Sequence, residues 1–176
     1  MKKVFVCADL HFSHNNIIKY ENRPFSDVNE MDEELIKNWN SVVSKDDKVF
    51  VLGDVAFTSK SRTKGLVGRL NGHKTLIMGN HDRGRTIQFW RDAGFDFVSP
   101  YPIVYKTQSD VLCVLSHEPM PYESFDYFNV YGHVHGDPLY LSHTKWSSCV
   151  SIERLNYRPA LLDDVVSGNA YDEDTK

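Results

Sequence analysis

The sequence is poor in cysteine, which bounds both the compartment and the kinds of metal site it can hold. Its three cysteines, Cys7, Cys113 and Cys149, are widely separated. They cannot all pair with one another, and their spacing matches no thiolate metal site. Each lies in an apolar, strand-like segment, so we expect reduced thiols buried in the core. The pattern favours a cytoplasmic protein.

Long apolar runs and an excess of positive charge are also missing. The first apolar run, residues 4–8, ends at Asp9 and is too short for the roughly 7–15 apolar residues of a secretion signal. No other run approaches the roughly 20 residues of a membrane span. With 20 basic and 24 acidic residues interspersed, the net charge of -4 argues against a general basic field. We therefore expect no membrane partner and no extended nucleic-acid surface, while a local positive site is still allowed.

Enough apolar sequence is present for one folded unit. The chain has 176 residues, of which 41% are hydrophobic, and a chain of this size buries about two-thirds of its unfolded surface. We expect a single domain over residues 1–166. The tail over residues 167–176 is small, polar and acidic, so we expect it to fray.

Apolar periodicity predicts strands alternating with helices and then mainly strands, which indicates an α/β fold. A stripe with helical spacing over residues 29–43, with acidic residues in its first turn, predicts a long helix. Shorter helices are expected near residues 17–18, over 66–70, and over 86–93 with Ile87, Trp90 and Ala93 facing inward. A hairpin turn is expected at 109–110 and a loop over 118–128. Strand-length apolar runs occupy residues 4–8, 48–52, 74–78, 97–98, 103–105, 111–115, 130–131 and 149–153.

Five of these strands stop at side chains that bind metals or transfer protons. The side chains are Asp9 with His11, Asp54, Asn80 with His81 and Asp82, His117, and His133 with His135. A single histidine at a strand end is most often a hydrogen-bonded structural residue. Several histidines crowded at one sheet edge, however, would lack partners for their ring nitrogens. Ligands bind at the carboxyl ends of strands in open α/β sheets, so we expect these groups to converge.

Divalent metal ions would supply the missing partners. Asp-x-His and His-x-His place two ligands on the same side of an extended segment. Mixed imidazole, carboxylate and amide ligands suit manganese, iron, zinc or nickel better than magnesium or calcium. The lack of cysteine in these turns argues against a purely structural zinc site. Gly79 can take a positive φ and turn the chain sharply, so that the polar groups emerge at the carboxyl end of the strand. By itself, Gly79-Asn80-His81-Asp82 also fits an ordinary polar turn.

The ordered set of motifs resembles the calcineurin-like metallophosphoesterase superfamily, and it spans residues 9–135. The motifs are Asp9-Leu10-His11, Gly53-Asp54, Gly79-Asn80-His81-Asp82, His117 and Gly132-His133-Val134-His135. The resemblance implies a two-sheet βαβ sandwich with flanking helices and a metal site at the carboxyl ends of the strands. The sequence over residues 9–16, 22–25 and 156–159 is similar to that of a group of small uncharacterised phosphoesterases of bacteria and phages.

The resemblance also implies a role for each site residue. One metal is expected on Asp9, His11 and His135 and a second on Asn80, His117 and His133, with Asp54 bridging both. His81 is expected to act on the leaving group or the phosphoryl group, with Asp82 orienting it. The segment after Asp54 lacks the further Asp-Arg pair of the protein phosphatase branch, which argues against protein phosphatase activity.

The resemblance predicts a metal-dependent hydrolase that attacks a phosphoester with a metal-bridging hydroxide. We expect two divalent ions, manganese foremost, and a small nucleotide-like phosphodiester as substrate. The alternatives are a phosphomonoesterase, a nuclease, or a catalytically silent metal-binding scaffold for protein interactions. Short connections between motifs leave no room for a DNA-binding cap, which weighs against the nuclease.

Four residues near the motifs are candidates for contact with the substrate. His14 and Asn15 follow the first motif, and solvation in a loop is an equal alternative for them. Arg23 and Arg83 could clamp phosphate with planar guanidinium groups, although surface arginines are common. Aromatic residues in 122–128 could form a wall for a nucleobase, with ordinary loop packing as the favoured reading. The sequence does not indicate the oligomeric state.

Overall fold

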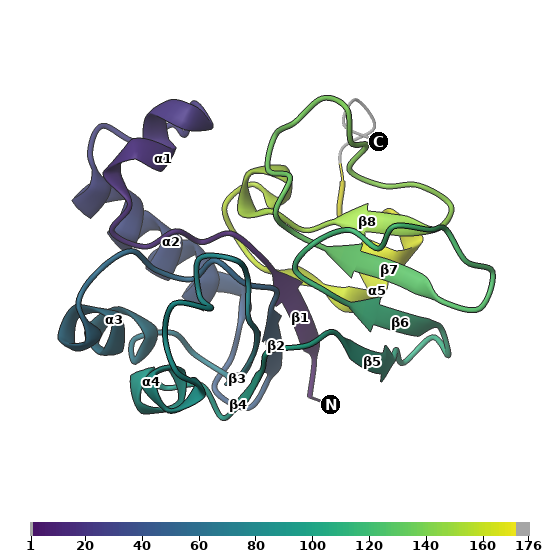
Figure 1. Ribbon diagram of the computed structural model, residues 1–176, viewed down its shortest axis with the longest axis horizontal. Coiled ribbons are helices and arrows are strands. Elements are labelled where there is room, and N and C mark those ends of the chain that lie inside the picture. The colour runs from purple at the N-terminus through teal and green to yellow at the C-terminus, as the bar shows by residue number, and fades with distance from the viewer. Residues whose placement is uncertain (1, 172–176) are drawn as a thin grey trace.

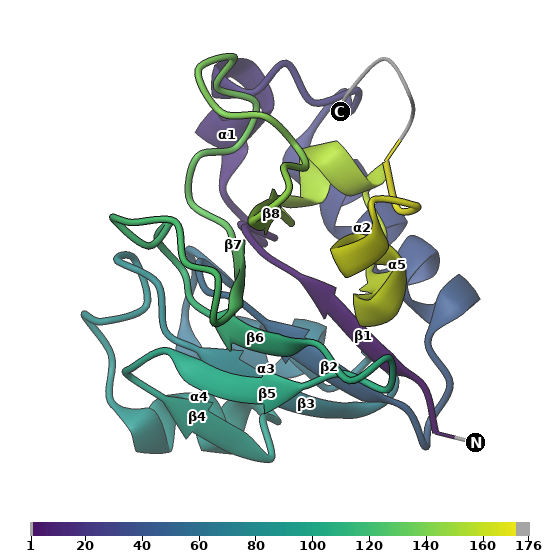
Figure 2. The same cartoon turned by 90° about the vertical axis from the view of Figure 1, so that its right-hand side faces the viewer.

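The protein is built from two β-sheets that pack face to face, with β1 (Val4–Cys7) at the seam between them. The computed structural model describes residues 2–171. Figure 1 shows the first sheet beside three helices and the second sheet on its other side. These helices are α2 (Val28–Val42), α3 (Lys60–Val67) and α4 (Ile87–Ala93). The turned view in Figure 2 shows β1 running diagonally between the two layers. The predicted α/β sandwich with flanking helices is confirmed.

The first sheet has the strand order β4-β3-β2-β1-β9. β1 to β4 are mutually parallel, and β9 pairs antiparallel with β1. Parallel strands covered on both faces read as continuous apolar runs, which is how these strands read in the sequence. The strands other than β1 are β2 (Lys48–Val51), β3 (His73–Ile77), β4 (Phe97–Ser99) and β9 (Ala160–Leu161).

The second sheet has the order β5-β6-β7-β8. Its first pair is an antiparallel hairpin closed near Asp110, whose φ is 72°, at the predicted turn. β7 is parallel to both β6 and β8, so β6 and β7 deliver their carboxyl ends to the same edge. The strands are β5 (Ile103–Lys106), β6 (Leu112–Leu115), β7 (Phe128–Tyr131) and β8 (Ser147–Cys149).

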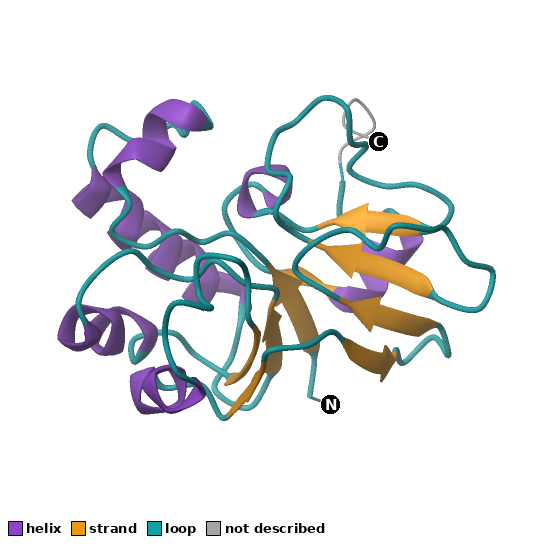
Figure 3. Ribbon diagram, in the orientation of Figure 1, coloured by secondary structure: helices purple, strands orange, loops and turns teal. Residues whose placement is uncertain are grey.

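Most helices cover the face of the first sheet that points away from the second, as Figure 3 shows. The long helix α2 is capped by Asp27, which accepts from the N–H groups of Asn29 and Glu30, and it buries Leu35 and Trp39. The helices are α1 (Asn15–Tyr20), α2 (Val28–Val42), α3 (Lys60–Val67), α4 (Ile87–Ala93) and α5 (Leu162–Ser167).

Several expected elements differ in their bounds. α3 begins earlier than residue 66, because Ser59 caps it by accepting from the N–H of Arg62, and it ends at Val67 before Gly68. In α4, Trp90 and Ala93 are buried as expected, but Ile87 is 42% exposed.

The end of the chain differs more. The strand expected over 149–153 instead becomes β8, followed by a 3-10 helix over Ile152–Leu155. β9 and α5 were not anticipated. The tail expected to fray from residue 167 packs against the core as far as Tyr171, which is 5% exposed and donates its hydroxyl to Cys149 O. The rest of that tail, 172–176, lies outside the described residues.

The core behaves as the cysteine pattern suggested. One apolar cluster runs through both sheets, and all three cysteines are free and buried. Within residues 2–171, no helix has both the length and the apolar character that crossing a membrane requires.

Candidate metal centre

The carboxyl ends of five strands meet at one edge of the sandwich, where the sequence motifs lie. β1, β2 and β3 of the first sheet and β6 and β7 of the second sheet contribute. The segments that follow these strands carry the seven predicted ligands Asp9, His11, Asp54, Asn80, His117, His133 and His135. The structure therefore brings residues from both halves of the chain to one place.

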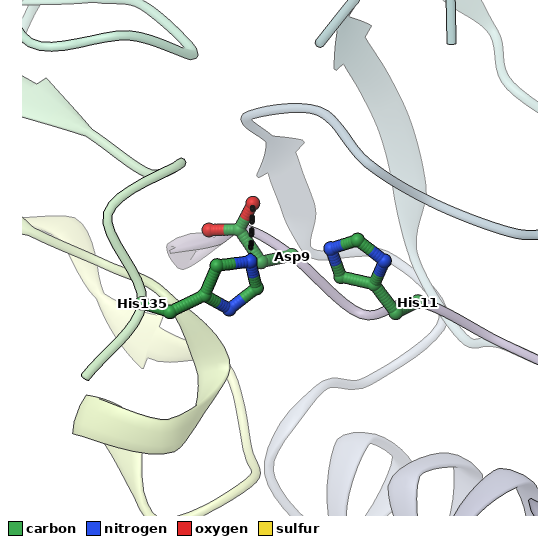
Figure 4. A group of neighbouring side chains, drawn as sticks. All are labelled: Asp9, His11 and His135. Atoms are coloured by element: carbon green, nitrogen blue, oxygen red, sulfur yellow. Dashed lines mark ion pairs between the residues drawn. The ribbon is translucent and has the colours of Figure 1, made fainter. Parts of the chain in front are cut away.

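Asp9, His11 and His135 form a first group. Each offers a ligand atom within 4.8 Å of the others. Figure 4 shows the two imidazole rings on either side of the Asp9 side chain. His135 Nε2 lies 4.0 Å from Asp9 Oδ1. This is the set that the sequence assigned to one metal.

A second group lies beside the first. Asp9, Asp54 and His117 also offer atoms within 4.8 Å of one another. Asn80 Oδ1 lies 2.8 Å from His117 Nε2 and 3.1 Å from His133 Nδ1. The predicted second set, Asn80, His117 and His133, is therefore in mutual contact.

Asp54 lies between the two groups and turns one carboxylate oxygen toward each. Its Oδ2 lies 3.6 Å from His11 Nε2, in the first group. Its Oδ1 lies 3.6 Å from His117 Nε2, in the second. One carboxylate therefore contacts histidines of both groups.

The buried histidines are held through one ring nitrogen and leave the other for a ligand. His117 Nδ1 lies 2.7 Å from Leu52 O, and a carbonyl only accepts, so Nδ1 carries the proton. His135 Nδ1 likewise faces Glu153 Oε1 at 3.2 Å. In both rings this contact leaves Nε2 as the nitrogen that faces the site, which is how metal-binding histidines are commonly oriented.

Two orphaned polar atoms show that a cation fits here. Asp9 Oδ1 and His11 Nε2 are buried and have no hydrogen-bond partner among the described residues. Burial raises the pKa of the Asp9 carboxyl, although His135, His117 and Ser151 act against this shift. Burial, with the charges of His135 and Arg23, holds the pKa of His11 well below its ordinary value, so the ring is neutral. A carboxylate oxygen and a neutral imidazole nitrogen are suitable ligands for a divalent cation.

The backbone at the ligands is strained. Five of the seven predicted ligands have left-handed φ angles: Asp9 at 59°, His11 at 51°, Asp54 at 55°, His133 at 72° and His135 at 47°. Non-glycine residues rarely adopt this region, and such outliers cluster at functional sites. Sheet packing on either side must therefore hold these segments in place.

Gly79 serves the site differently from the expected sharp turn. It is not among the glycines with positive φ. A Cβ at this position would instead collide with Asp54 Oδ1 and approach His117 Cε1 to 2.8 Å. Gly79 is needed because the chain passes directly against two predicted ligands.

His81 and Asp82 do not form the expected pair. The His81 side chain is 47% exposed, with Nε2 3.8 Å from Asp54 Oδ2. Among the described residues, the Asp82 carboxylate accepts from the N–H groups of Gly79, Asp54 and Val55 rather than from the His81 ring. Burial raises the Asp82 pKa to about 6, although these hydrogen bonds lower it. Asp82 therefore fastens the loops, and its expected role in orienting His81 is corrected.

An aromatic platform near His81 escaped the sequence reasoning. Phe57 stacks on His14 with ring centroids 4.1 Å apart, and it also lies 4.7 Å from the His81 ring and 5.2 Å from the His11 ring. His14 is thereby held beside the site, with Nδ1 3.3 Å from His11 Nδ1. Asn15 is exposed at the start of α1.

The two predicted arginines have different surroundings. Arg23 is 3% exposed and binds the carbonyls of Asp9 and Leu10 together with the Glu153 carboxylate, so it faces the protein and not a substrate. Arg83 lies at the surface, 3.6 Å from Glu118. Glu153 was missed as a site residue, because its neighbours His135 and Arg23 are distant in sequence.

An open cavity of about 640 Å³ adjoins the second sheet's side of the centre. His133 and His135 form part of its wall, beside Tyr20, Glu21 and Tyr140. Glu21, His135 and Glu153 also offer ligand atoms within 4.8 Å of one another. Space for a small substrate therefore lies directly against the predicted ligands.

Comparison with known proteins finds relatives of this chain in an archaeon and in a phage. The chain is 36% identical over 173 residues to an uncharacterised protein of Methanocaldococcus jannaschii, covering 94% of this chain and 90% of the relative. It is 41% identical over 88 residues to the gene 66 protein of Mycobacterium phage L5, covering 47% of this chain and 41% of the phage protein.

The fold and the family are recognised as well. The crystal structure of a protein of unknown function from Aquifex aeolicus matches with a TM-score of 0.74 at 20% identity, covering 95% of this chain and 99% of that one. The family model for calcineurin-like phosphoesterases matches residues 2–171. The chain therefore belongs to the calcineurin-like phosphoesterase family of metal-dependent phosphoester hydrolases.

Proposed function

We propose that the protein hydrolyses a small phosphodiester with two divalent ions, manganese foremost and iron, zinc or nickel as alternatives. Asp9, His11 and His135 would hold one ion. The second would be held by a set of three, Asn80, His117 and His133. The observation that supports two ions is the Asp54 carboxylate, with one oxygen toward each group.

The ions and the chain have separate tasks. When bound, two divalent ions polarise phosphoryl oxygens and make water a nucleophile at neutral pH. The chain supplies the acid: His81 is half exposed beside the site and can give a proton to the leaving oxygen. His14 and Phe57 border the same space and can contact the substrate. Asn15 remains a proposed contact through its place next to His14.

The charges around the site favour a diester over a monoester. A monoester carries up to two negative charges, so cationic side chains beside the site would stabilise it more than they would a diester. Arg23 is committed to Glu153 and backbone carbonyls, and Arg83 lies beside Glu118. The adjoining cavity is lined by Glu21 and Asp137. A singly charged diester is repelled less by these carboxylates.

The size and shape of the site favour a small substrate. The adjoining cavity of about 640 Å³ suits a nucleotide-sized molecule. The net charge of -4 gives no broad attraction for nucleic acid. Three buried thiols also support a cytoplasmic location.

The test strips the protein with a chelator and restores manganese, nickel or zinc in turn. We expect turnover of bis(p-nitrophenyl) phosphate to exceed that of p-nitrophenyl phosphate, and bound metal to approach two equivalents. Asp54→Asn is a second test, and it should disturb both metal sites because Asp54 faces both groups. Preference for the monoester would reverse the substrate assignment. Full metal occupancy without turnover of either ester would favour the scaffold.

A further inference from the structure

Glu153 and Arg23 form a buried ion pair directly behind the His135 ring. Glu153 lies in the 3-10 helix Ile152–Leu155, and Arg23 lies 130 residues earlier. Arg23 Nη2 is 2.6 Å from Glu153 Oε1, and the two side chains are 0% and 10% exposed. Water screens such a pair little, so its charges act strongly on their neighbours.

Each partner of this pair holds a residue of the first ligand group. Arg23 donates from Nη2 to Asp9 O at 2.7 Å and from Nη1 to Leu10 O at 2.9 Å. Glu153 Oε1 lies 3.2 Å from His135 Nδ1 and accepts a hydrogen bond from it. The pair thereby joins the segment after β1 to the segment after β7, both of which have left-handed backbone at the ligand.

The His135 segment is held from its other side by the residue next to Glu153. Arg154 donates to His135 O and, at 2.9 Å, to Asp137 O. Two residues of the 3-10 helix thus hold His135: Arg154 binds its main-chain carbonyl, and Glu153 binds its imidazole ring. Both the position and the rotation of the ring are fixed from this short helix.

We propose that Glu153, anchored by Arg23, is a positioning residue for the metal held by Asp9, His11 and His135; the inference rests on the proposed function. A carboxylate that accepts from Nδ1 fixes Nε2 toward the ion and raises the basicity of the imidazole. His117 has a neutral carbonyl, Leu52 O, in the equivalent place. Glu153 therefore acts on one metal site and not on the other.

A different reading would make Glu153 a ligand itself. Glu21, His135 and Glu153 lie close enough to hold an ion, and Glu153 Oε2 is buried with no partner among the described residues. Against this, Glu153 Oε1 already accepts from Arg23 and His135, and the Arg23 charge repels a cation. The two readings predict different numbers of bound ions.

The experiment titrates metal-free protein with Mn²⁺ by calorimetry and compares wild type with Glu153→Met and Glu153→Gln. Glu153→Met removes the acceptor, so we expect one class of site to weaken by about 10- to 100-fold while the other is unchanged. Glu153→Gln keeps an acceptor oxygen and should recover part of the affinity. With Co²⁺ in place of Mn²⁺, the visible absorption spectrum of Glu153→Met should differ from that of the wild type, because the spectrum of bound Co²⁺ reports on its imidazole ligand.

Two further variants guard the interpretation. Glu118→Gln removes an exposed negative charge next to His117 in the sequence, where the carboxylate faces Arg83, and this variant should bind both ions as the wild type does. Leaving Arg23 buried without its partner could unfold the protein, so the double variant Arg23→Met with Glu153→Met removes both charges. The circular dichroism spectrum of this variant should match that of the wild type, and its Mn²⁺ affinity should fall at one site only.

The outcomes separate the hypotheses. If each site binds Mn²⁺ with the same affinity in Glu153→Met as in the wild type, the positioning role is overturned. Three bound ions in wild type and two in Glu153→Gln would overturn it in favour of a ligand role. A wild-type protein that binds no Mn²⁺ would refute the proposed function and the inference with it. If the wild type binds two ions and Glu153→Met binds them with the same affinities, only the inference is refuted.

Discussion

The Asp82 carboxylate accepts a hydrogen bond of 2.7 Å from the main-chain N–H of Asp54, 28 residues earlier in the chain. The same oxygen accepts from Gly79 N at 2.9 Å, and the other oxygen accepts from Val55 N at 3.1 Å. One side chain thus ties the loop after β2 to the loop after β3. Asp54 and Asn80 are held in register through this connection.

Replacing Asp82 with Ala should therefore loosen the site rather than only slow the chemistry. Removing a charged acceptor from buried N–H groups costs roughly 1.5–3 kcal/mol in the free energy of unfolding. Urea denaturation should show this loss, and manganese affinity should fall with it. Asp82→Asn, which keeps one acceptor oxygen, should lose less. Unchanged stability and metal affinity with lost turnover would restore Asp82 as the residue that orients His81.

His81→Gln should give the opposite pattern. Because the His81 ring is half exposed and its Nε2 is 3.8 Å from the Asp54 carboxylate, its loss should leave the metals bound. The loss of a general acid should lower kcat by about 10²- to 10⁴-fold. Metal analysis beside steady-state kinetics checks both parts. A release of metal in step with the loss of turnover would identify His81 as a ligand instead.

Gly79→Ala should damage the centre although it adds only one methyl group. The new Cβ would meet the Asp54 carboxylate and the His117 ring, which lie on fixed strand ends. A shift of about 1 Å at catalytic groups can cost roughly 100-fold in rate. Gly84→Ala is the matched control, because a Cβ there meets nothing within 4 Å. Equal activity of the two variants would contradict the close approach.

The motifs could be predicted from the sequence because each follows a strand directly. Asp9, Asn80 and His117 need only the strand direction and the shared sheet edge to come together. Glu153 could not be found in this way, since its partners His135 and Arg23 are joined only by tertiary packing.

Neighbours in sequence were also misleading. Asp82 follows His81, yet its side chain points back to the amides of Gly79, Asp54 and Val55. The polar residues at the start of α3 carry no apolar stripe, so the cap at Ser59 defines that helix better than periodicity does. Local pattern therefore predicted the ligands, and the residues that hold them required the fold.

At the amino end of β2, far along the strand from the metal centre, Asp47 provides a test of stability against pH. The carboxylate accepts from Lys3 N, Ser44 N and Ser44 Oγ. Burial raises the pKa of Asp47, but the hydrogen bonds outweigh it and hold the pKa below the ordinary 3.8. A folded-state pKa below the unfolded value stabilises the protein above that pH and less so as pH falls through it.

Asp47→Asn should accordingly lower the free energy of unfolding by about 1–3 kcal/mol at neutral pH. The difference from wild type should shrink as the pH falls below about 4, since the wild-type carboxylate then becomes protonated. Urea denaturation across this range gives the measurement, and turnover at neutral pH should be unchanged. Parallel stability curves for the two proteins would show that the carboxylate charge is not used.

The position of β1 between the two sheets makes the metal centre sensitive to movement of one sheet relative to the other. Ala8 accepts from Ile152 N and donates to Val150 O, so the strand that carries Asp9 and His11 is bonded to the chain leaving the second sheet. His117, His133 and His135 come from that second sheet, and Asp54 and Asn80 from the first. A slide of one sheet along the other would part both ligand groups at once. Bound ions would then link the two sheets to each other. We expect the protein to lose activity on gentle heating before its helices and strands unfold, because a small slide between the sheets separates the ligands.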